Sequence, residues 1–407
     1  MSRSVDEHVR AVATAVRGAA DQRFREQPIE RPVDERLSGR LAASARSRLD
    51  VPGFDNSQMD GFAVHAIDLA HAAHSPVALP TVAHVVAGDD SPPPLAPGTT
   101  APIMTGAPIP PGADAVVPVE RTRPGGFGPV EGGALVEFVE PVSPGTFVRP
   151  RGADVRSGDA VLEAGAPLHA VAVGALVVAG VESVAVAPAL RVAIVATGAE
   201  LVSGAVPDSN SQALLAHARE LGLHASAHLV PDEPTQLESL LTRLAAENDL
   251  VITTGGVSAG TREVVRQVLE PTPDAWFGHV AVQPGGPQGL AQLHDGDRGV
   301  PVVCLPGNPV SVLVSFELFL RTPLARAAGR VAGRPSGSAP LAAPLTSPAG
   351  RLQVRRGRLD ADGSVSLVGE AGSHLAVSYA RAELLVFVPE ATTALDAGDT
   401  VEWWRIA

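Results

Sequence analysis

Several short apolar runs in this chain end in glycine-rich polar segments, and apolar positions with helical spacing follow each of them. Residues 249–260 read DLVITTGGVSAG, and residues 300–309 read VPVVCLPGNP. An apolar run of this length predicts a buried parallel strand, and the glycines predict a loop at its carboxyl end. We therefore predict two strands of an open α/β sheet whose loops meet at the carboxyl edge, where small ligands bind in such folds.

The same alternation of strand and helix extends along the middle of the chain. We predict strands at 191–197, 250–254 and 302–305, and helices that begin near 209 and cover 263–269 and 310–320. Ser209 and Asn210 are residue types that favour a helix N-cap. Strands that alternate with helices in this way indicate a three-layer α/β domain with a parallel sheet, which we place at 188–330.

Other patterns flank this domain. Residues 4–26 have one apolar face, typical of a helix, whereas 51–140 consist of short apolar runs broken by Pro and Gly, typical of a β domain with many turns. We expect 141–187 to pack on the N-terminal helix, and 332–350 to be a linker ahead of strands within 377–389 and 400–406. The predicted units are a mixed α/β domain (1–50 plus 141–187), an inserted β domain (51–140), the α/β domain (188–330) and a small C-terminal β domain (335–407).

Composition narrows the possible functions. A net charge of -13 over 407 residues argues against a general nucleic-acid binder and against a protein that binds an anionic membrane surface. All 31 basic residues are arginine, so no lysine takes part in catalysis. The one cysteine, Cys304, excludes an internal disulfide. With no apolar leader and no membrane-length apolar stretch in the sequence, we expect a cytoplasmic protein.

The glycines of the 249–260 segment suggest an anion site. Without side chains at Gly255, Gly256 and Gly260, backbone N–H groups can approach a phosphate at the start of a helix. A tight strand-to-helix connection explains such a loop equally well. Acidic residues at the same predicted edge, namely Glu200, Asp232, Glu233 and Glu263, would hold a divalent cation beside a phosphoanhydride. Taken singly, each is better explained as a cap, a turn residue or a solvated charge.

Seven segments in series resemble the molybdopterin molybdenumtransferases, the MoeA and gephyrin E-domain type of enzyme. Their order and spacing fit over nearly the whole chain. The segments are DNSQMDGFAV (55–64), IMTGAPIPPGADAVVPVE (103–120), RPRGADVRSGD (149–159), VATGAEL (195–201), PDSNSQALLA (207–216), TTGGVSAG (253–260) and LPGNPVSVLVSFELF (305–319).

The resemblance implies an elongated homodimer that inserts molybdenum from molybdate into adenylylated molybdopterin and releases AMP, with help from Mg²⁺. The pterin nucleotide would lie between the α/β domain of one subunit and the inserted domain of the other. The molybdopterin adenylyltransferase, which supplies this substrate, would be a partner.

The resemblance also assigns roles to residues. Gly255, Gly256 and Ser258 would cradle phosphate, and the segment 306–311, with Pro306, Gly307, Asn308 and Ser311, would form the facing wall. On the partner side of the cleft would lie Asp60, Thr105 and Glu120. Catalysis would fall to Asp60 and to three residues that contact the pterin or handle Mg²⁺, which are Glu200, Asp232 and Glu263, with Asp232 and Glu263 as the Mg²⁺ ligands.

The chain departs from the family at the loop expected to hold molybdate. Where the family has the lysine-rich pattern KPGKP, this chain reads QPGGP, from Gln283 to Pro287. Gln283 can still donate a hydrogen bond, but Gly286 offers only backbone. Arg351 and Ser373 fall near the positions that complete the molybdate site, so arginine would carry the missing charge. Glu263 replaces the usual aspartate, and Pro102 a common arginine.

These departures keep two other hypotheses in view. One is a carrier or binding paralogue that holds the pterin nucleotide without inserting metal. The other is an adenylyltransferase that makes the substrate, which the α/β domain alone resembles but the flanking segments do not.

Overall fold

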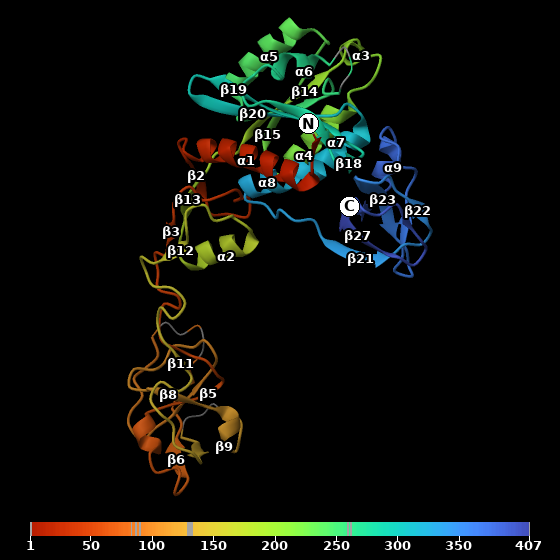
Figure 1. Cartoon of the computed structure of the whole chain (residues 1–407). Coiled ribbons are helices and arrows are strands. Elements are labelled where there is room, and N and C mark those ends of the chain that lie inside the picture. The colour runs from red at the N-terminus through yellow and green to blue at the C-terminus, as the bar shows by residue number, and fades with distance from the viewer. Residues whose placement is uncertain are drawn as a thin grey trace.

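The computed structural model describes residues 2–82, 84–85, 88, 91–127, 133–258, 260 and 263–406. The molecule is elongated, with an upper body, a narrow neck and a lower lobe (Figure 1). The upper body contains the α/β domain and the C-terminal β domain, and the lower lobe is the β unit inserted between the two halves of the neck region. None of the helices in the described part of the chain is long and apolar enough to cross a membrane.

A seven-stranded sheet forms the centre of the upper body. Four neighbouring strands, β20, β16, β14 and β15, run parallel, and β19 is antiparallel to β20. The strands, in sheet order, are β1 (Ser2–Arg3), β17 (Trp276–Val280), β19 (Pro287–Asp295), β20 (Arg298–Leu305), β16 (Leu250–Thr254), β14 (Arg191–Thr197) and β15 (His224–Val230). The predicted bounds of 191–197 and 250–254 are confirmed. The strand predicted at 302–305 begins four residues earlier, at Arg298.

Alternate strand residues supply two apolar layers, because side chains along a strand point to opposite faces. Ile194 and Ile252 pack with helices on one face, and Val195 and Val251 pack with helices on the other. The first face is covered by α1 (Val5–Phe24), α4 (Ser209–Glu220), α7 (Pro309–Ser315) and α8 (Arg321–Ala327), and the second by α5 (Pro234–Glu247) and α6 (Val264–Leu269). The remaining short helix, α3 (Ala199–Val202), follows β14. The predicted three-layer α/β domain is confirmed.

The helix predicted at 310–320 is confirmed, as α7 followed directly by a π-helical segment, η3 (Phe316–Leu320). The expected packing of 141–187 on the N-terminal helix was wrong. The N-terminal helix α1 packs on the sheet through Val12 and Val16. Residues of the 141–187 segment instead share a core with 37–45, where Leu41 and Leu176 are fully buried. The apolar face of α1 is therefore used by the α/β domain.

The neck region consists of short paired strands and one helix. These are β2 (Ile29–Pro32) with β13 (Ser183–Val186), β3 (Ala45–Arg46) with β12 (Ala160–Leu162), and α2 (Ala170–Val178). The lower lobe contains β4 (Asn56–Ser57) with β11 (Val148–Arg149), a sheet of β7 (Ala101–Ile103), β5 (Gly61–Val64) and β8 (Ala115–Pro118), and a sheet of β6 (Val77–Pro80), β10 (Leu135–Phe138) and β9 (Thr122–Arg123). Phe62 and Phe138 anchor its core, as expected for a β unit rich in turns.

The C-terminal domain is a sheet that includes a strand from the α/β domain. Its strands are β18 (Val282–Gln283), β23 (Leu352–Leu359), β25 (Leu384–Val388), β27 (Thr400–Arg405) and β21 (Ser336–Pro340), with β24 (Val365–Leu367) beside β23, and β22 (Leu345–Thr346) paired with β26 (Ala394–Leu395). The expected linker at 332–350 was therefore wrong in part, because β21 and β22 lie within it. The strands expected within 377–389 and 400–406 are confirmed as β25 and β27, and a short helix, α9 (Ala376–Ala380), precedes β25.

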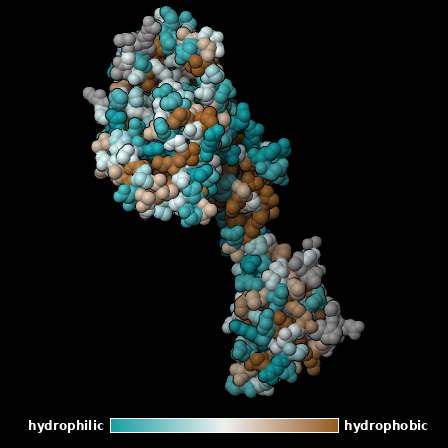
Figure 2. Space-filling model, turned by 90° about the vertical axis from the view of Figure 1, so that its right-hand side faces the viewer, coloured by the Kyte–Doolittle hydropathy of each residue, from teal (hydrophilic) through white to brown (hydrophobic). Residues whose placement is uncertain are grey.

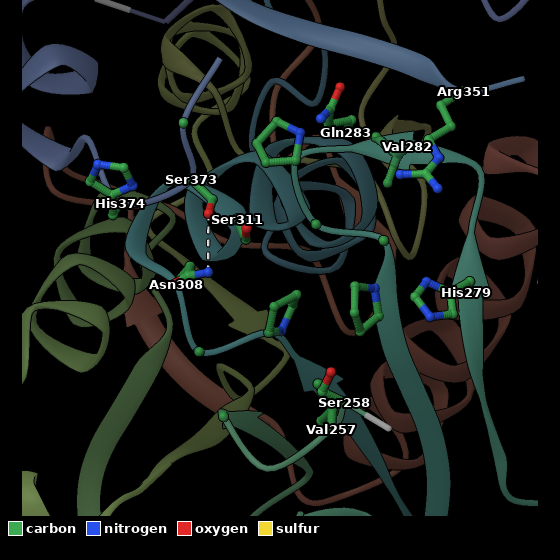
Figure 3. Close-up of a pocket in the computed structure, with 18 of the residues that line it drawn as sticks. Val257, Ser258, His279, Val282, Gln283, Asn308, Ser311, Arg351, Ser373 and His374 are labelled. Carbon is green, nitrogen blue, oxygen red and sulfur yellow. Dashed lines mark hydrogen bonds between the residues drawn. The ribbon is translucent and has the colours of Figure 1, made fainter. Parts of the chain in front are cut away.

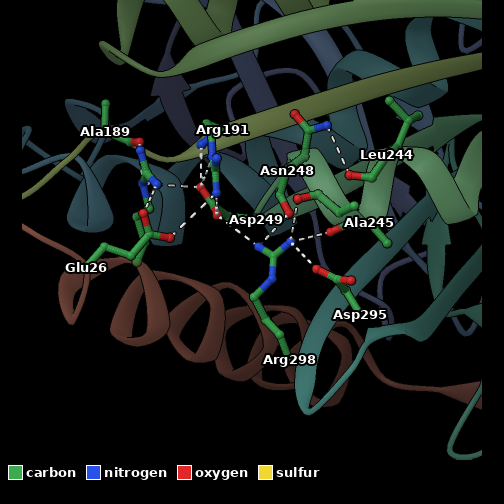
Figure 4. Close-up of polar contacts among 11 residues, drawn as sticks. Glu26, Ala189, Arg191, Leu244, Ala245, Asn248, Asp249, Asp295 and Arg298 are labelled. Carbon is green, nitrogen blue, oxygen red and sulfur yellow. Dashed lines mark hydrogen bonds and ion pairs between the residues drawn. The ribbon is translucent and has the colours of Figure 1, made fainter.

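A buried carboxylate fixes the amino ends of the central strands. Asp249, whose side chain is 4% exposed, lies just before β16. Arg191 at the start of β14 binds it at 3.0 Å, and Arg298 at the start of β20 lies 3.4 Å from it (Figure 4). Arg23 of α1 lies 3.5 Å away. This cluster holds three strands and a helix together at the edge of the sheet opposite the ligand-binding edge.

Candidate active-site pocket

The two glycine-rich loops meet at the carboxyl edge of the sheet, as predicted. β16 and β20 are parallel neighbours with Thr254 opposite Leu305, and the Gly255 N–H donates to the Leu305 carbonyl at 3.1 Å. The Cα of Gly255 is 3.4 Å from the position that a Cβ on Gly307 would occupy. Glycine at both positions therefore allows the two loops to touch.

Gly256 has a backbone that a side chain would strain. Its φ is +65°, and a Cβ there would lie 2.9 Å from the Val265 nitrogen. The loop is also fastened from within, because the Ser258 N–H donates to the Glu263 carboxylate at 2.9 Å. Of the predicted donors, the N–H groups of Gly255 and Ser258 thus already have partners. Residues 259, 261 and 262 of this loop lie outside the described residues.

The loop after β17 joins the α/β domain to the C-terminal sheet. β18 leaves the central sheet and pairs with β23, and Gln353 donates to the Gln283 side-chain oxygen at 3.1 Å. Within the described residues the Gln283 amide nitrogen has no hydrogen-bond partner, so it can donate to a ligand. Gly285 is fixed by a second contact, because the side-chain amide of buried Gln288 donates a hydrogen bond to the Gly285 carbonyl at 2.8 Å. The loop predicted to hold molybdate is therefore rigidly supported on two sides.

A third wall comes from the C-terminal domain. Asn308 donates to the Ser373 hydroxyl at 3.0 Å, and the Val310 N–H donates to the Ser373 carbonyl at 3.0 Å (Figure 3). Beneath this wall the side chain of Arg356, 1% exposed, donates to the backbone carbonyls of Glu370 and Gly372. These contacts hold the 370–373 segment against the start of α7.

These three walls enclose a pocket of about 760 Å³. It brings together most of the predicted ligand-binding residues, from five separate segments of the chain. They are Gly255, Gly256, Ser258, Glu263, Gln283, Pro287, Pro306, Gly307, Asn308, Ser311, Arg351 and Ser373. Ligand pockets of this size accommodate a molecule as large as a nucleotide.

Five predicted residues do not line this pocket. Glu200 lies on α3 after β14, and Asp232 lies just after β15, so both belong to the same edge of the sheet but are exposed outside the pocket. Asp60, Thr105 and Glu120 lie in the lower lobe. There the Asp60 carboxylate accepts hydrogen bonds from the backbone N–H and the hydroxyl of Thr105, both at 2.7 Å, and these two bonds lower its pKa.

Sequence reasoning missed two histidines of the pocket, His279 and His374. His279 is the fourth residue of β17, four positions before Gln283, and His374 follows Ser373 directly. Each lies beside a segment that the family resemblance had marked, so closeness in sequence was the available signal. Within the described residues, no cluster of three or more His, Cys, Asp or Glu side chains forms a metal site.

A three-layer α/β domain with a polar pocket at its carboxyl edge, joined to an inserted β unit and a C-terminal sheet, defines a multidomain protein with a candidate ligand-binding pocket. Residues 3–180 match the MoeA N-terminal region (domain I and II), residues 193–326 the probable molybdopterin binding domain, and residues 338–406 the MoeA C-terminal region (domain IV). The chain belongs to the molybdopterin molybdenumtransferase family, whose members are transferases of molybdenum cofactor biosynthesis.

Individual relatives cover almost the whole chain. It is 38% identical to molybdopterin molybdenumtransferase 2 of Mycobacterium tuberculosis over 99% of this chain and 100% of that protein. It is 32% identical to the molybdopterin molybdenumtransferase of Haemophilus influenzae over 87% of this chain and 88% of that one. Among solved structures, the molybdopterin biosynthesis MoeA protein of Pyrococcus horikoshii has a TM-score of 0.72 at 27% identity, with 100% of both chains covered.

Proposed function

We propose that this protein inserts molybdenum from molybdate into adenylylated molybdopterin and releases AMP. The proposal rests on the residues that line the pocket described above. The loop expected to bind phosphate, with Gly256 and Ser258, faces the residues expected to bind molybdate, with Gln283, Arg351 and Ser373. A pocket that accommodates both anions at once can bring the metal and the pterin together.

In this reaction the main task of the protein is to position molybdate and the pterin nucleotide. Two Mo–S bonds to the dithiolene replace one Mo–O bond, and the two thiol protons leave with that oxygen as water. A second water cleaves the phosphoanhydride and gives AMP and the terminal phosphate of the pterin. The Gly255–Ser258 loop would hold the phosphates, and the wall from Pro306 to Ser311 would face it. Backbone and hydroxyl donors on these loops would stabilise the charge that develops as the anhydride breaks.

The residues present fit Mg²⁺. This ion is usually held by one or two carboxylates and by the phosphates of the substrate, with several waters retained. The Glu263 carboxylate lines the pocket beside the Ser258 backbone, where such phosphates would lie. We therefore assign Mg²⁺ binding to Glu263, and Asp232 and Glu200 at the outer rim to the nucleotide. When bound, the ion would neutralise phosphate charge.

We also propose a homodimer in which the inserted domain of one subunit covers the pocket of the other. Asp60, Thr105 and Glu120 are exposed in the lower lobe, away from the pocket of their own chain (Figure 1). The helix α2 at the neck supports a protein contact, because Val171, Val177 and Val178 are 58–78% exposed. A brown patch is visible at this level in Figure 2. Exposed apolar patches of this kind mark interaction surfaces.

The distinguishing experiment measures AMP release by the purified protein with adenylylated molybdopterin and Mg²⁺, with and without molybdate. We expect release that requires molybdate. Tight binding of the pterin nucleotide without release at any molybdate concentration would instead identify a carrier, the alternative that the lysine-free loop suggests. Consumption of ATP with molybdopterin as substrate would identify an adenylyltransferase.

A further inference from the structure

The loop from Gln283 to Pro287 carries no cation, so it would bind an oxyanion through directed hydrogen bonds alone. A lysine is a point charge on a flexible stem and can follow an anion over a range of positions. A hydrogen bond, in contrast, weakens steeply when donor and acceptor are misaligned. A loop that binds by hydrogen bonds must therefore be held in one geometry before the ligand arrives.

Two buried glutamines are attached to this loop from within the protein. Gln288, the second residue of β19, is 0% exposed, and Gln353, the second residue of β23, is 3% exposed. Neither of them is one of the residues that line the pocket. Glutamine is mostly exposed in folded proteins, and a buried position behind a ligand site usually carries an apolar side chain. The placement of these two amides therefore has a specific cause.

Gln288 joins the middle of the loop to the end of helix α7. Its amide nitrogen donates to the Gly285 carbonyl at 2.8 Å and to the Ser315 hydroxyl at 2.7 Å. Gly285 has a φ of +102°, and a Cβ there would lie 2.9 Å from the Ser315 side-chain oxygen. The loop thus packs directly on α7, and one buried amide connects the two.

Gln353 fixes the side chain with which the loop begins. β18 and β23 are parallel with Gln283 opposite Gln353, and the Gln353 amide nitrogen donates to the Gln283 side-chain oxygen at 3.1 Å. This bond orients the Gln283 amide and leaves its nitrogen to meet a ligand. The other end of the loop is closed by the Val280 N–H, which donates to the Gly286 carbonyl at 2.8 Å.

The two amides cost the folded state free energy that apolar side chains would not. The side-chain oxygens of Gln288 and Gln353 are both buried and have no hydrogen-bond partner among the described residues. A buried acceptor without a partner is destabilising. The amide nitrogens of both side chains donate to the loop. The shape of the loop, rather than the stability of the core, therefore accounts for the two glutamines.

We propose that Gln288 and Gln353 are positioning residues for molybdate, which fix the geometry of the 283–287 loop and so replace the reach of a lysine. This inference rests on the proposed function. It also concerns selectivity. Sulfate has the charge of molybdate but is a smaller tetrahedron, so donors at a fixed spacing discriminate between the two ions, whereas donors on a loop that can adjust do not.

The experiment measures the dissociation constants of molybdate and sulfate by equilibrium dialysis, and KM and kcat for molybdate in AMP release, with full-length protein. Wild type is compared with Gln288→Met, Gln353→Met and the control Gln292→Met, an exposed glutamine on the same strand as Gln288. Both buried changes should weaken molybdate binding about tenfold, the effect of one lost hydrogen bond. KM should rise in parallel, while kcat and the affinity for the pterin nucleotide stay unchanged. Sulfate binding should weaken less than molybdate binding, and the control should match wild type.

Two further comparisons separate positioning from folding. Methionine has nearly the volume of glutamine and no amide to bury, so Tm should not fall in either variant. In a Gln283→Ala background, Gln353→Met should have no further effect on molybdate binding, because it acts through that side chain. Ser315→Ala, which removes one acceptor of Gln288, is the smallest change and should also weaken molybdate binding at an unchanged Tm.

The inference and the proposed function fail in different ways. Unchanged molybdate affinity in Gln288→Met, Gln353→Met and Ser315→Ala would overturn the positioning role while leaving the insertase intact. An equal loss of affinity for molybdate and for the pterin nucleotide would overturn it as well, because the glutamines would then support the whole pocket. Absence of molybdate-dependent AMP release in wild type would overturn the proposed function itself.

Discussion

At the scale of single residues, Gly256 is a position in the pocket where the backbone does not accept a side chain without distortion. Its positive φ and the 2.9 Å approach to the Val265 nitrogen mean that Gly256→Ala distorts the phosphate loop. We expect at least a tenfold loss in affinity for the pterin nucleotide, measured by titration. The control is Gly296→Ala, a positive-φ glycine with open space around it, which should cost about 1 kcal/mol of stability and no affinity. Equal binding by both variants would contradict the assignment of the loop.

The sequence predicted that these loops follow the strands, because an apolar run that ends in glycines can be recognised from neighbouring residues alone. It did not predict which N–H groups are free. The partners of Gly255 and Ser258 are the Leu305 carbonyl and the Glu263 carboxylate, and each becomes a neighbour only in the folded chain. His279 was missed for the same reason, since its contact with Gly286 depends on the turn after β17.

His8 gives the protein a specific response to acid. Its ring is buried between Trp276 and Phe319, with centroid distances of 5.3 and 4.7 Å, and neither ring nitrogen has a partner among the described residues. Burial, with a smaller contribution from Arg3, lowers the pKa of His8 to about 3.

Because the folded pKa lies below the ordinary value, the unfolded chain takes up a proton below about pH 6.5 that the folded chain does not. The His8 contribution is therefore present above that pH and is lost as the pH falls toward 3, by up to about 1.4 kcal/mol per unit. We expect Tm to fall less steeply between pH 7 and 5 in His8→Leu than in wild type. Parallel declines in the two proteins would contradict this assignment.

At the scale of elements, the Asp249 cluster couples β14, β16, β20 and α1 without touching the pocket. Removing its charge takes away the buried carboxylate that Arg191 and Arg298 share, although Arg191 keeps Glu26 and Arg298 keeps Asp295 as partners. Asp249→Asn should lower the free energy of unfolding by about 2–3 kcal/mol, measured in urea, and leave ligand affinity unchanged in the folded protein. The control Asp295→Asn, at a half-exposed partner of Arg298, should cost less than about 1 kcal/mol. A similar cost for the two variants would show that the cluster does not fasten the sheet.

Prediction from sequence succeeded for elements whose periodicity is local and failed where tertiary contacts decide. The strands at 191–197 and 250–254 are continuous apolar runs that occur with those bounds. Residues 332–350 are rich in Pro, Gly, Ser and Ala, yet β21 forms there because it pairs with β27, more than sixty residues later. Likewise, the apolar face of α1 did not reveal which domain it would cover.

At the scale of the whole molecule, the account requires a site shared between two subunits. Asp60→Ala, in the lower lobe, and Glu263→Ala, in the pocket, should each abolish AMP release. When the two variants are mixed and allowed to exchange subunits, each mixed dimer has one intact site, so activity should return to about a quarter of wild type. A mixture of Asp60→Ala with Glu120→Ala is the control. Both changes lie in the inserted domain, so no intact site forms. Failure of the first mixture, despite subunit exchange, would contradict the shared site.

The central claim is that one pocket joins molybdate to the pterin. The most direct test detects molybdenum in the product, by mass spectrometry and elemental analysis of the pterin formed in a single turnover. The account predicts one molybdenum bound to the dithiolene for each AMP that the wild-type protein releases. AMP release that yields a pterin without molybdenum would contradict it.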